Sequence, residues 1–178
     1  MVALDRTGLH VSLTIRFRLA TEADLPKLEW HGQFAHFRPL FRKAFQEQKA
    51  GRRAMLIADC HDFPIGHIFV QFARSKATYT DDEERAYLYS LRVMEMFQGQ
   101  GIGTRLIHMA EGLIQDRRME WVTIAVGKQN IGALRLYERL GYDIYTDDPG
   151  RWSYRDHQGI VRHMNEPSWL LQKRLYLR

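Results

Sequence analysis

The sequence predicts a single domain of the mixed α/β class. Its 178 residues are 45% hydrophobic and 12% aromatic, which is enough apolar material for one sizeable core. Stretches of alternating apolar and polar residues, typical of strands, are interleaved with stretches that have helical spacing. The predicted order is a strand, two helices, three strands, a helix, a strand, a helix and two strands. We therefore expect one sheet with helices packed on it, formed by residues 1–178 as one domain.

The N-terminal part predicts an outer strand followed by two helices. Residues 13–20, "LTIRFRLA", alternate apolar and basic side chains, as a half-exposed strand does. Thr21 is suited to cap a helix, with Asp24 three residues later. Phenylalanines recur at helical spacing within residues 30–46, and Pro39 is expected to break this segment into two helices.

The middle of the chain predicts three strands, a glycine-rich turn and a helix. The strands are expected at 54–60, 65–73 and 86–93, and the first two are joined by a short turn. After the turn, apolar residues at helical spacing predict a helix over 102–114. This helix carries an apolar stripe, so we expect it to pack on the sheet.

The C-terminal part predicts a buried strand, a capped helix and more strands. Residues 121–126, "WVTIAV", are almost wholly apolar, which indicates a strand covered on both faces, as in a parallel pairing. Asn130 can cap the next helix and Gly141 can end it. The remaining expected elements are strands at 142–146 and 168–177 and a small hairpin that turns at 157–159.

Charge and cysteine content restrict the class of protein. The formal net charge is +5, but the basic residues are scattered and accompany no nucleic-acid motif, so we expect no nucleic-acid partner. The single cysteine, Cys60, precludes an intramolecular disulfide and stands in a strand where a buried thiol is expected. Asp5 and Arg6 interrupt the N-terminal residues, which therefore lack the long apolar core of a signal peptide. No apolar run elsewhere approaches the roughly 20 residues of a bilayer span. We therefore expect a cytoplasmic protein with no membrane partner.

Three closely spaced glycines, Gly99, Gly101 and Gly103, stand where the central helix begins. Glycine costs about 0.5–1 kcal/mol relative to alanine inside a helix, so this turn is expected to need bare backbone. A strand, a glycine turn and a helix together present unpaired amides to an anion. The nucleoside triphosphate loop requires a lysine directly after its last glycine, and it is excluded because Thr104 and Arg105 follow Gly103. The dinucleotide fingerprint is excluded because the spacing is G-x-G-x-G.

The turn "QGQGIG" (98–103) resembles the Q/R-x-x-G-x-G/A pyrophosphate-binding signature of the GNAT acyltransferases, which use acetyl-coenzyme A. A strand ending in "LRV" precedes the turn and the strand "WVTIAV" follows its helix, as in that superfamily. The stretch "NIGALRLYERLGY" (130–142) resembles the superfamily's N-x-x-A-x-x-L-Y-x-x-x-G-F/Y motif. The resemblance is most specific over 86–146, which is thereby expected to form the cofactor-binding core.

The resemblance implies both a fold and a function. The fold is a mixed central sheet of about six to seven strands, with a splay between the two central parallel strands and about four flanking helices. The function is acetyl-coenzyme A-dependent N-acetyl transfer to an amine of a small molecule, protein or peptide by direct attack. The alternative is a non-catalytic acetyl-coenzyme A-binding sensor or complex subunit. The implied reaction requires no metal, and the resemblance is also compatible with a homodimer.

The resemblance further implies which residues hold the cofactor. Val93 would pair with pantetheine through its backbone, and Asn130 would line the cleft. The Leu91 amide would point at the acetyl carbonyl oxygen, where negative charge develops during acyl transfer. The backbone amides expected to surround the pyrophosphate are those of Gln98, Gly99, Gln100, Gly101, Ile102, Gly103 and Thr104.

The resemblance names a general acid, whereas the general base stays open. The resemblance makes Tyr137 the general acid that protonates the leaving thiolate, whereas periodicity alone would assign it to packing on the inner face of its helix. The base stays open, because the strand at 86–93 contains no acidic residue. Its nearest candidates are Glu83, Glu84, Tyr87 and Tyr89.

Residues 30–46 and 147–166 are expected to hold the acceptor, from their place in the superfamily's element order. The first segment is rich in Phe, Trp and Arg, and includes His31 and His36, for which a surface or packing role is expected. The second offers Trp152, Tyr154 and His157. An aromatic wall with acids nearby would suit an organic cation, whereas the arginines would suit a carboxylate, and both alternatives are open at this point.

Overall fold

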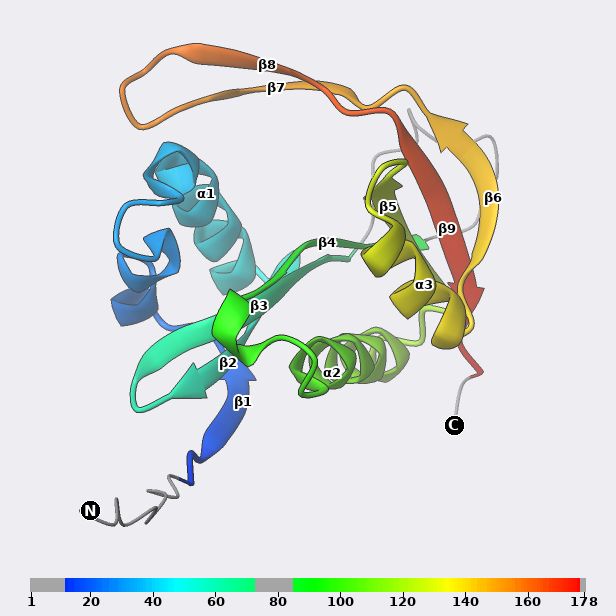
Figure 1. Cartoon of the computed structure of the whole chain (residues 1–178), viewed down its shortest axis with the longest axis horizontal. Coiled ribbons are helices and arrows are strands. Elements are labelled where there is room, and N and C mark those ends of the chain that lie inside the picture. Colours follow the sequence, from blue (N-terminus) through cyan, green and yellow to red (C-terminus); the bar gives the residue numbers. More distant parts are fainter. Residues whose placement is uncertain (1–11, 73–84, 177–178) are drawn as a thin grey trace, which may run out of the picture.

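The computed structural model describes residues 12–72 and 85–176, which are built around one seven-stranded sheet (Figure 1). Its neighbouring strands are antiparallel, except for the central pair β4 and β5, which is parallel. In spatial order the strands are β1 (Ile15–Leu19), β2 (Arg53–Cys60), β3 (Phe63–Gln71), β4 (Arg85–Val93), β5 (Trp121–Gly127), β9 (Ser168–Arg174) and β6 (Asp143–Asp148). The predicted mixed α/β class is confirmed.

Helices cover both faces of this sheet. Alternate residues of β2 contact different hydrophobic clusters: Ala54 and Leu56 pack in the cluster that includes α2, and Met55 and Ile57 pack in the one that includes α1. The two helices therefore lie on opposite faces (Figure 1). The α-helices of the described residues are α1 (Arg38–Lys49), α2 (Ile102–Asp116) and α3 (Ile131–Arg139). Short 3-10 helices are η1 (Glu22–Asp24), η2 (Lys27–Glu29), η3 (Ala35–Phe37) and η5 (Glu95–Phe97).

The two helices predicted after the first strand take a different form. Thr21 begins η1 as expected, because its N–H and Oγ1 both donate to Asp24 Oδ2, at 2.7 and 2.8 Å. The helix stops after one turn, since Pro26 has no amide hydrogen with which to extend it. The expected break at Pro39 is wrong: Pro39 lies in the first turn of α1, where helical amides have no intrahelical partner anyway.

The two central strands separate along their length. β4 and β5 are paired over four residues, from Arg85 opposite Trp121 to Leu88 opposite Ile124. Beyond that point β4 stays paired with β3, and β5 stays paired with β9. The facing edges of β4 and β5 therefore diverge after Leu88, which confirms the predicted splay.

A β-bulge in β4 lies just where the splay opens. His67 is opposite Arg92 and Phe69 is opposite Tyr89, so Ser90 and Leu91 together face a single residue of β3. Ser90 has a φ of 57°, in the left-handed region that a serine seldom adopts. Because of the extra residue, side chains after the bulge face the opposite side of the sheet from the one that their position would otherwise give them. Leu91 consequently packs against the α2 cluster, and Arg92 turns to the α1 side, where it contacts Phe34.

A two-stranded hairpin, β7 (Arg151–Arg155) and β8 (Val161–Asn165), extends from the sheet across α1 (Figure 1). Its turn is organised by Asp156, whose Oδ1 accepts hydrogen bonds from the amides of Gln158 and Ile160. At its base, Gly150 O accepts a hydrogen bond from Glu166 N at 3.0 Å. A Cβ on Gly150 would lie 1.8 Å from the Glu166 carbonyl oxygen, so only glycine allows this approach. The predicted hairpin is confirmed.

Candidate functional site

The backbone conformation of the glycine turn requires glycine at two positions. Gly99 and Gly101 have φ values of 73° and 80°, which side chains with a Cβ rarely adopt. A Cβ built on either residue would meet no heavy atom within 4 Å. The space in front of these two glycines is therefore open, and a ligand can approach the backbone there.

Unpaired amides follow this turn at the start of α2. The first helical hydrogen bond runs from Arg105 N to Gly101 O, at 2.9 Å. The amides of Ile102, Gly103 and Thr104 precede it, in the part of a helix that has no intrahelical acceptor and carries partial positive charge. The turn and the start of the helix together leave backbone donors available to an anion.

Two glutamine side chains shape the turn. Gln98 Nε2 donates to Val93 O at 2.9 Å, and Gln100 Nε2 donates to Met96 O at 3.2 Å. The Gln98 amide donates to Glu95 O at 3.1 Å, so it is already engaged. The Gln98 side chain thus ties the turn to the end of β4, and its amide already has an acceptor within the turn.

Leu91 belongs to the bulge, and Val93 lies between the bulge and this turn. Both side chains are half-buried against the α2 cluster. A Cβ on Gly103 would lie 3.9 Å from Val93 Cγ2, so the end of β4 and the start of α2 are in close contact. The end of the diverging edge of β4 therefore lies next to the amides at the start of α2.

Asn130 and Tyr137 belong to α3, on the other side of the splay. Asn130 Oδ1 accepts a hydrogen bond from Ala133 N at 3.1 Å, which confirms it as the helix cap. Tyr137 is 4% exposed, with its ring 5.9 Å from that of Tyr142. Burial, and the nearby phenol of Tyr87, raise the pKa of Tyr137. The Tyr137 phenol therefore stays protonated at neutral pH, as a general acid must.

Two of the base candidates are described and two are not. Glu83 and Glu84 lie outside the described residues. Tyr87 and Tyr89 are stacked, with ring centroids 5.9 Å apart. The Tyr89 hydroxyl accepts a hydrogen bond from Arg53 Nη1, yet burial still raises the pKa of Tyr89. Of these two tyrosines, Tyr87 is the one that interacts electrostatically with Tyr137 and raises its pKa.

The structure brings together the two segments expected to hold the acceptor. Tyr154 of β7 packs on Phe37, with ring centroids 5.2 Å apart, and lies 6.4 Å from His36. Phe34 stacks on Phe37 at 6.3 Å. We refer to these four residues, Phe34, His36, Phe37 and Tyr154, as the aromatic cluster. Other rings of the same sequence stretch belong to the core, as Phe41 does at 3% exposure.

Arg92 and His67 are functional candidates that sequence reasoning missed. The Arg92 guanidinium lies over the rings of Phe34 and Phe37, and Arg92 Nη1 is 3.4 Å from His67 Nε2. A signal was present in the sequence: apolar residues occupy even positions up to Leu88 and odd positions from Leu91. That change of parity indicates a bulge, and hence that Arg92 faces away from the α2 cluster.

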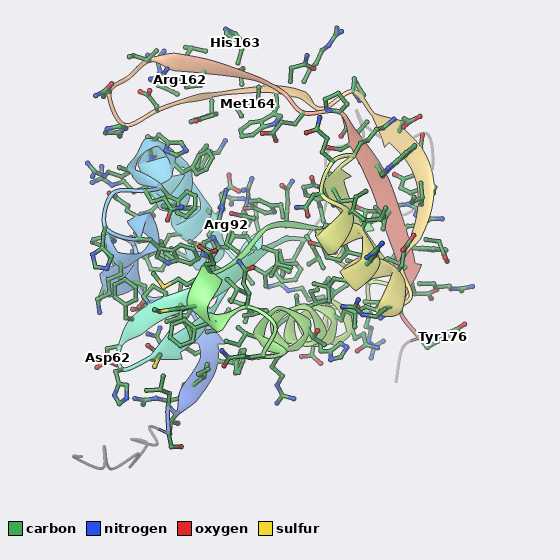
Figure 2. The ribbon with its side chains drawn as sticks, in the orientation of Figure 1. Asp62, Arg92, Arg162, His163, Met164 and Tyr176 are labelled. Atoms are coloured by element: carbon green, nitrogen blue, oxygen red, sulfur yellow. The ribbon has the colours of Figure 1, made fainter. Side chains whose placement is uncertain are left out.

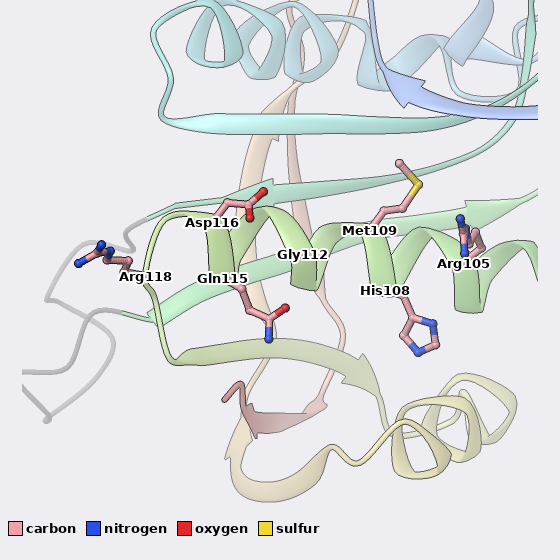
Figure 3. Close-up of a pocket in the computed structure, with 7 residues that line it drawn as sticks. All are labelled: Arg105, His108, Met109, Gly112, Gln115, Asp116 and Arg118. Carbon is pink, nitrogen blue, oxygen red and sulfur yellow. The ribbon is translucent and has the colours of Figure 1, made fainter. Parts of the chain in front are cut away.

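A surface depression of about 700 Å³ lies elsewhere, along α2 (Figure 3). Its lining residues all come from α2 and the turn that follows it: Arg105, His108, Met109, Gly112, Gln115, Asp116 and Arg118. It contains none of the residues predicted for the cofactor or the acid. The depression is therefore separate from the splay.

The described residues include neither a cluster of metal-ligand side chains nor a helix that could cross a membrane. In residues 12–72 and 85–176, no three His, Cys, Asp or Glu side chains are grouped as metal ligands would be. No helix within these ranges has both the length and the hydropathy to cross a bilayer. Cys60 is buried, as its strand context predicts.

Comparison with known proteins identifies relatives of this arrangement. A 95-residue segment is 30% identical to an uncharacterized N-acetyltransferase from Methanocaldococcus jannaschii, and covers 53% of this chain and 41% of that protein. A 72-residue segment is 32% identical to the mycothiol acetyltransferase of Thermobifida fusca, and covers 40% of this chain and 22% of that protein. The matched segments thus span less than half the length of these curated relatives.

The fold and the family model agree. The structure is similar to that of NAA60 from Arabidopsis thaliana in complex with acetyl-CoA, with a TM-score of 0.71 and 20% identity over 91% of this chain and 99% of that one. Residues 21–142, more than half of the chain, match the family model described as Acetyltransferase (GNAT) family. The chain belongs to the acetyltransferase (GNAT) family.

Proposed function

We propose that this chain is an acetyl-coenzyme A-dependent N-acetyltransferase whose acceptor is an amine of a small molecule, protein or peptide. The observation that carries the proposal is the splay of β4 from β5 beyond Leu88, with open amides at the start of α2 shortly after β4. The buried phenol of Tyr137, on the helix that follows β5, supports it. Membership of the GNAT family and the likeness to a fold solved with acetyl-CoA support the same activity.

The residues present fit the cofactor. The open space in front of Gly99 and Gly101 leaves room for a pyrophosphate against bare backbone. The amides from Gly99 to Thr104 would hold it, and the free edge of Val93 and the Asn130 side chain would border the pantetheine arm. When bound, acetyl-coenzyme A supplies an acetyl group activated as a thioester.

Three groups of the chain have separate proposed roles in the acetyl transfer. The Leu91 amide, within the bulge, is the proposed donor to the acetyl carbonyl oxygen, and such a donor is effective because its position is fixed before the reaction. Tyr137 Oη holds the proton that a leaving sulfur needs. Tyr87 is the base candidate that lies near this acid in the described chain.

A non-catalytic sensor of acetyl-coenzyme A is the alternative function. The sensor would need the cofactor path but not a buried, protonated phenol beside it. Acetylation of a panel of amines, followed by release of free thiol, separates the two. Amine-dependent thiol release is expected; tight acetyl-coenzyme A binding with no thiol release on any amine would support the sensor.

Three wider features complete the proposal. Residues 1–178 form one domain, with 86–146 as its cofactor-binding part, supported by a sheet that runs from β1 to β6. The protein acts in the cytoplasm, a location supported by its single, buried cysteine. Its scattered basic charge serves the anionic cofactor rather than a nucleic acid or a membrane.

A further inference from the structure

We propose that Arg92 forms a carboxylate-binding subsite beside the aromatic cluster, so that the acceptor amine carries a carboxylate close to its reactive nitrogen. This inference rests on the proposed N-acetyltransferase function and goes beyond it, because it names the chemical class of the acceptor. It also decides between the organic cation and the carboxylate that the sequence leaves open.

The position of Arg92 follows from the bulge. The extra residue at Ser90 turns Arg92 to the side of the sheet on which α1 packs, one residue beyond Leu91. Figure 2 shows Arg92 on β4 beside α1, with the β7–β8 hairpin above it. Its guanidinium carbon lies 4.7 Å from the ring centre of Phe34 and 5.0 Å from that of Phe37. The charge is thus held next to the expected acetyl position and on the acceptor side of it.

Arg92 lacks the partner that neighbouring arginines have. Arg38 is paired with Glu29, Arg53 with Glu47 and Arg162 with Asp156. In the described structure no carboxylate oxygen lies within 4 Å of Arg92; its polar contacts are Ser90 Oγ and His67 Nε2. A guanidinium held among rings without a carboxylate is a site prepared for an anion.

Part of the guanidinium is available for such an anion. Both polar contacts are made by Nη1. Nε and Nη2, which form the other edge of the fork, make no hydrogen bond in the described structure, and neither is among its buried atoms without a partner. Two parallel donors on one edge match the two oxygens of a carboxylate.

The surrounding charges leave this positive charge uncompensated. His67 is fully buried, and burial together with Arg92 lowers the pKa of its imidazole well below the usual range, so it is neutral. Burial and Arg92 also lower the pKa of His36. Glu166 attracts the Arg92 charge from outside ion-pair distance, but burial outweighs it and lowers the pKa of Arg92. An organic cation here would meet repulsion from Arg92, whereas a carboxylate would be attracted.

A carboxylate of this kind has two sources: a free amino acid, or an acidic side chain at the start of a peptide. Both would present one carboxylate near one amine. The test uses the acetylated products as probes, because their binding to the coenzyme A-loaded protein requires no turnover. The first arm compares N-acetylglycine, N-acetylphenylalanine and N-acetylglutamine with their C-terminal amides, which carry no charge. The second compares an N-acetylated peptide amide that begins with aspartate with one that begins with asparagine.

In isothermal titration calorimetry, the acid of at least one pair should bind about 10–100-fold more tightly than its neutral counterpart, as expected for a charged bidentate contact. A preference in the first arm identifies a free amino acid, and a preference confined to the second identifies a peptide. Arg92→Gln should remove the preference. Arg92→Lys, which keeps the charge but not the fork, should retain part of it. Lys43→Gln removes the same charge from the exposed side of α1 and should retain all of it.

Equal binding of every acid and its neutral counterpart would refute the subsite. So would an acid preference that survives in Arg92→Gln. If Arg92→Gln fails to melt cooperatively, Arg92→Lys decides, since an unchanged preference in that variant would also refute the bidentate contact. The proposed activity is judged separately, by coenzyme A titration and amine-dependent thiol release. Titrations repeated without coenzyme A keep the carboxylate result independent of that outcome.

Discussion

Tyr137 is the residue on which the proposed chemistry depends most. It is 4% exposed, and burial raises the pKa of its phenol, so the oxygen carries a proton throughout the neutral range. The ring also packs against Tyr142, which is what periodicity alone predicts for the inner face of this helix. The two roles are separable because only the acid role needs the hydroxyl.

Tyr137→Phe keeps the ring and removes the proton. We expect the turnover number to fall by roughly 10²–10⁴-fold, the range typical of a lost proton-transfer group, with the coenzyme A dissociation constant nearly unchanged. Steady-state kinetics and calorimetry measure the two quantities. A fall of less than about threefold, with chemistry shown to limit the rate, would assign Tyr137 to packing.

His67 makes the stability of the fold depend on pH. It is fully buried among rings, and its Nδ1 has no hydrogen-bond partner. Burial, then Arg92, lowers the pKa of its imidazole, so the folded state favours the neutral form. The unfolded chain binds a proton first, and stability is lost as the pH falls below the unfolded pKa of about 6.5.

Between about pH 6.5 and 5, the free energy of unfolding should therefore fall by up to roughly 1.4 kcal/mol per pH unit through this one group. His67→Gln should remove that part of the decline, whereas His163→Gln, on exposed β8, should not. Urea titrations at several pH values give the curves. Buried carboxylates such as Asp24, whose pKa is lowered, act at more acidic pH. Parallel curves for wild type and His67→Gln would contradict the assignment.

At the scale of elements, the glycine turn and α2 act as one unit. Gly101 ends the turn with a φ of 80° and its carbonyl accepts the first hydrogen bond of the helix. The position that a Cβ on Gly101 would take is open, and the amides that follow belong to the first turn of the helix, which has no intrahelical acceptor. An anion bound there would be stabilised by donors and by the helix dipole together.

Gly101→Asp places a side chain and a negative charge in this space. Calorimetry should show coenzyme A binding largely lost, while the melting curve stays cooperative. Gly51→Asp is the matched control, because Gly51 has a φ of 73° and equally open surroundings but lies between α1 and β2. Unchanged coenzyme A affinity in Gly101→Asp, or an equal loss in Gly51→Asp, would exclude the turn as the pyrophosphate site.

The β7–β8 hairpin is the element that we propose closes the acceptor side. Trp152 stacks on Tyr154 at 5.3 Å, and Tyr154 in turn packs on Phe37. Trp152→Ala should raise the Michaelis constant for the amine severalfold and leave that for acetyl-coenzyme A unchanged. Ile160→Ala, at the exposed turn of the hairpin, should change neither constant. An effect of Trp152→Ala on the acetyl-coenzyme A constant alone would place the hairpin on the cofactor side.

At the scale of the whole molecule, one sheet connects every part of the proposed site. β3 and β4 carry His67 and Arg92, and β5 continues the same sheet toward α3 and Tyr137. Tyr137, the glycine turn and the proposed acceptor side are therefore all attached to one sheet. A chain built in this way should unfold as a unit.

Calorimetric unfolding should accordingly give one transition, with equal calorimetric and van't Hoff enthalpies. Coenzyme A at about 100 times its dissociation constant should stabilise the folded state by roughly 2.7 kcal/mol and raise the transition temperature. Adenosine, which lacks the pyrophosphate, is the control and should raise it less. Two separate transitions, with only one moved by coenzyme A, would contradict a single domain over residues 1–178.

The sequence by itself determined the local features of this protein. The strands, α2, the cap at Asn130 and the hairpin could be predicted because each depends on side-chain periodicity or on a residue with a fixed backbone preference. The glycine turn could be predicted for the same reason, and its resemblance to a known signature named the cofactor. Pro39 was misjudged because proline both breaks a helix and begins one, and its neighbours in space decide which.

Only the tertiary structure decided what the acceptor side contains. Residues 30–46 and 147–166 are more than 100 positions apart, and no pattern within either segment shows that Tyr154 packs on Phe37. The orientation of Arg92 depends on one extra residue in β4, which reverses the strand's alternation against β3. Whether that arginine has a carboxylate partner is then a matter of distances between elements. Those distances come from the packing of the whole chain, and a sequence read residue by residue does not contain them.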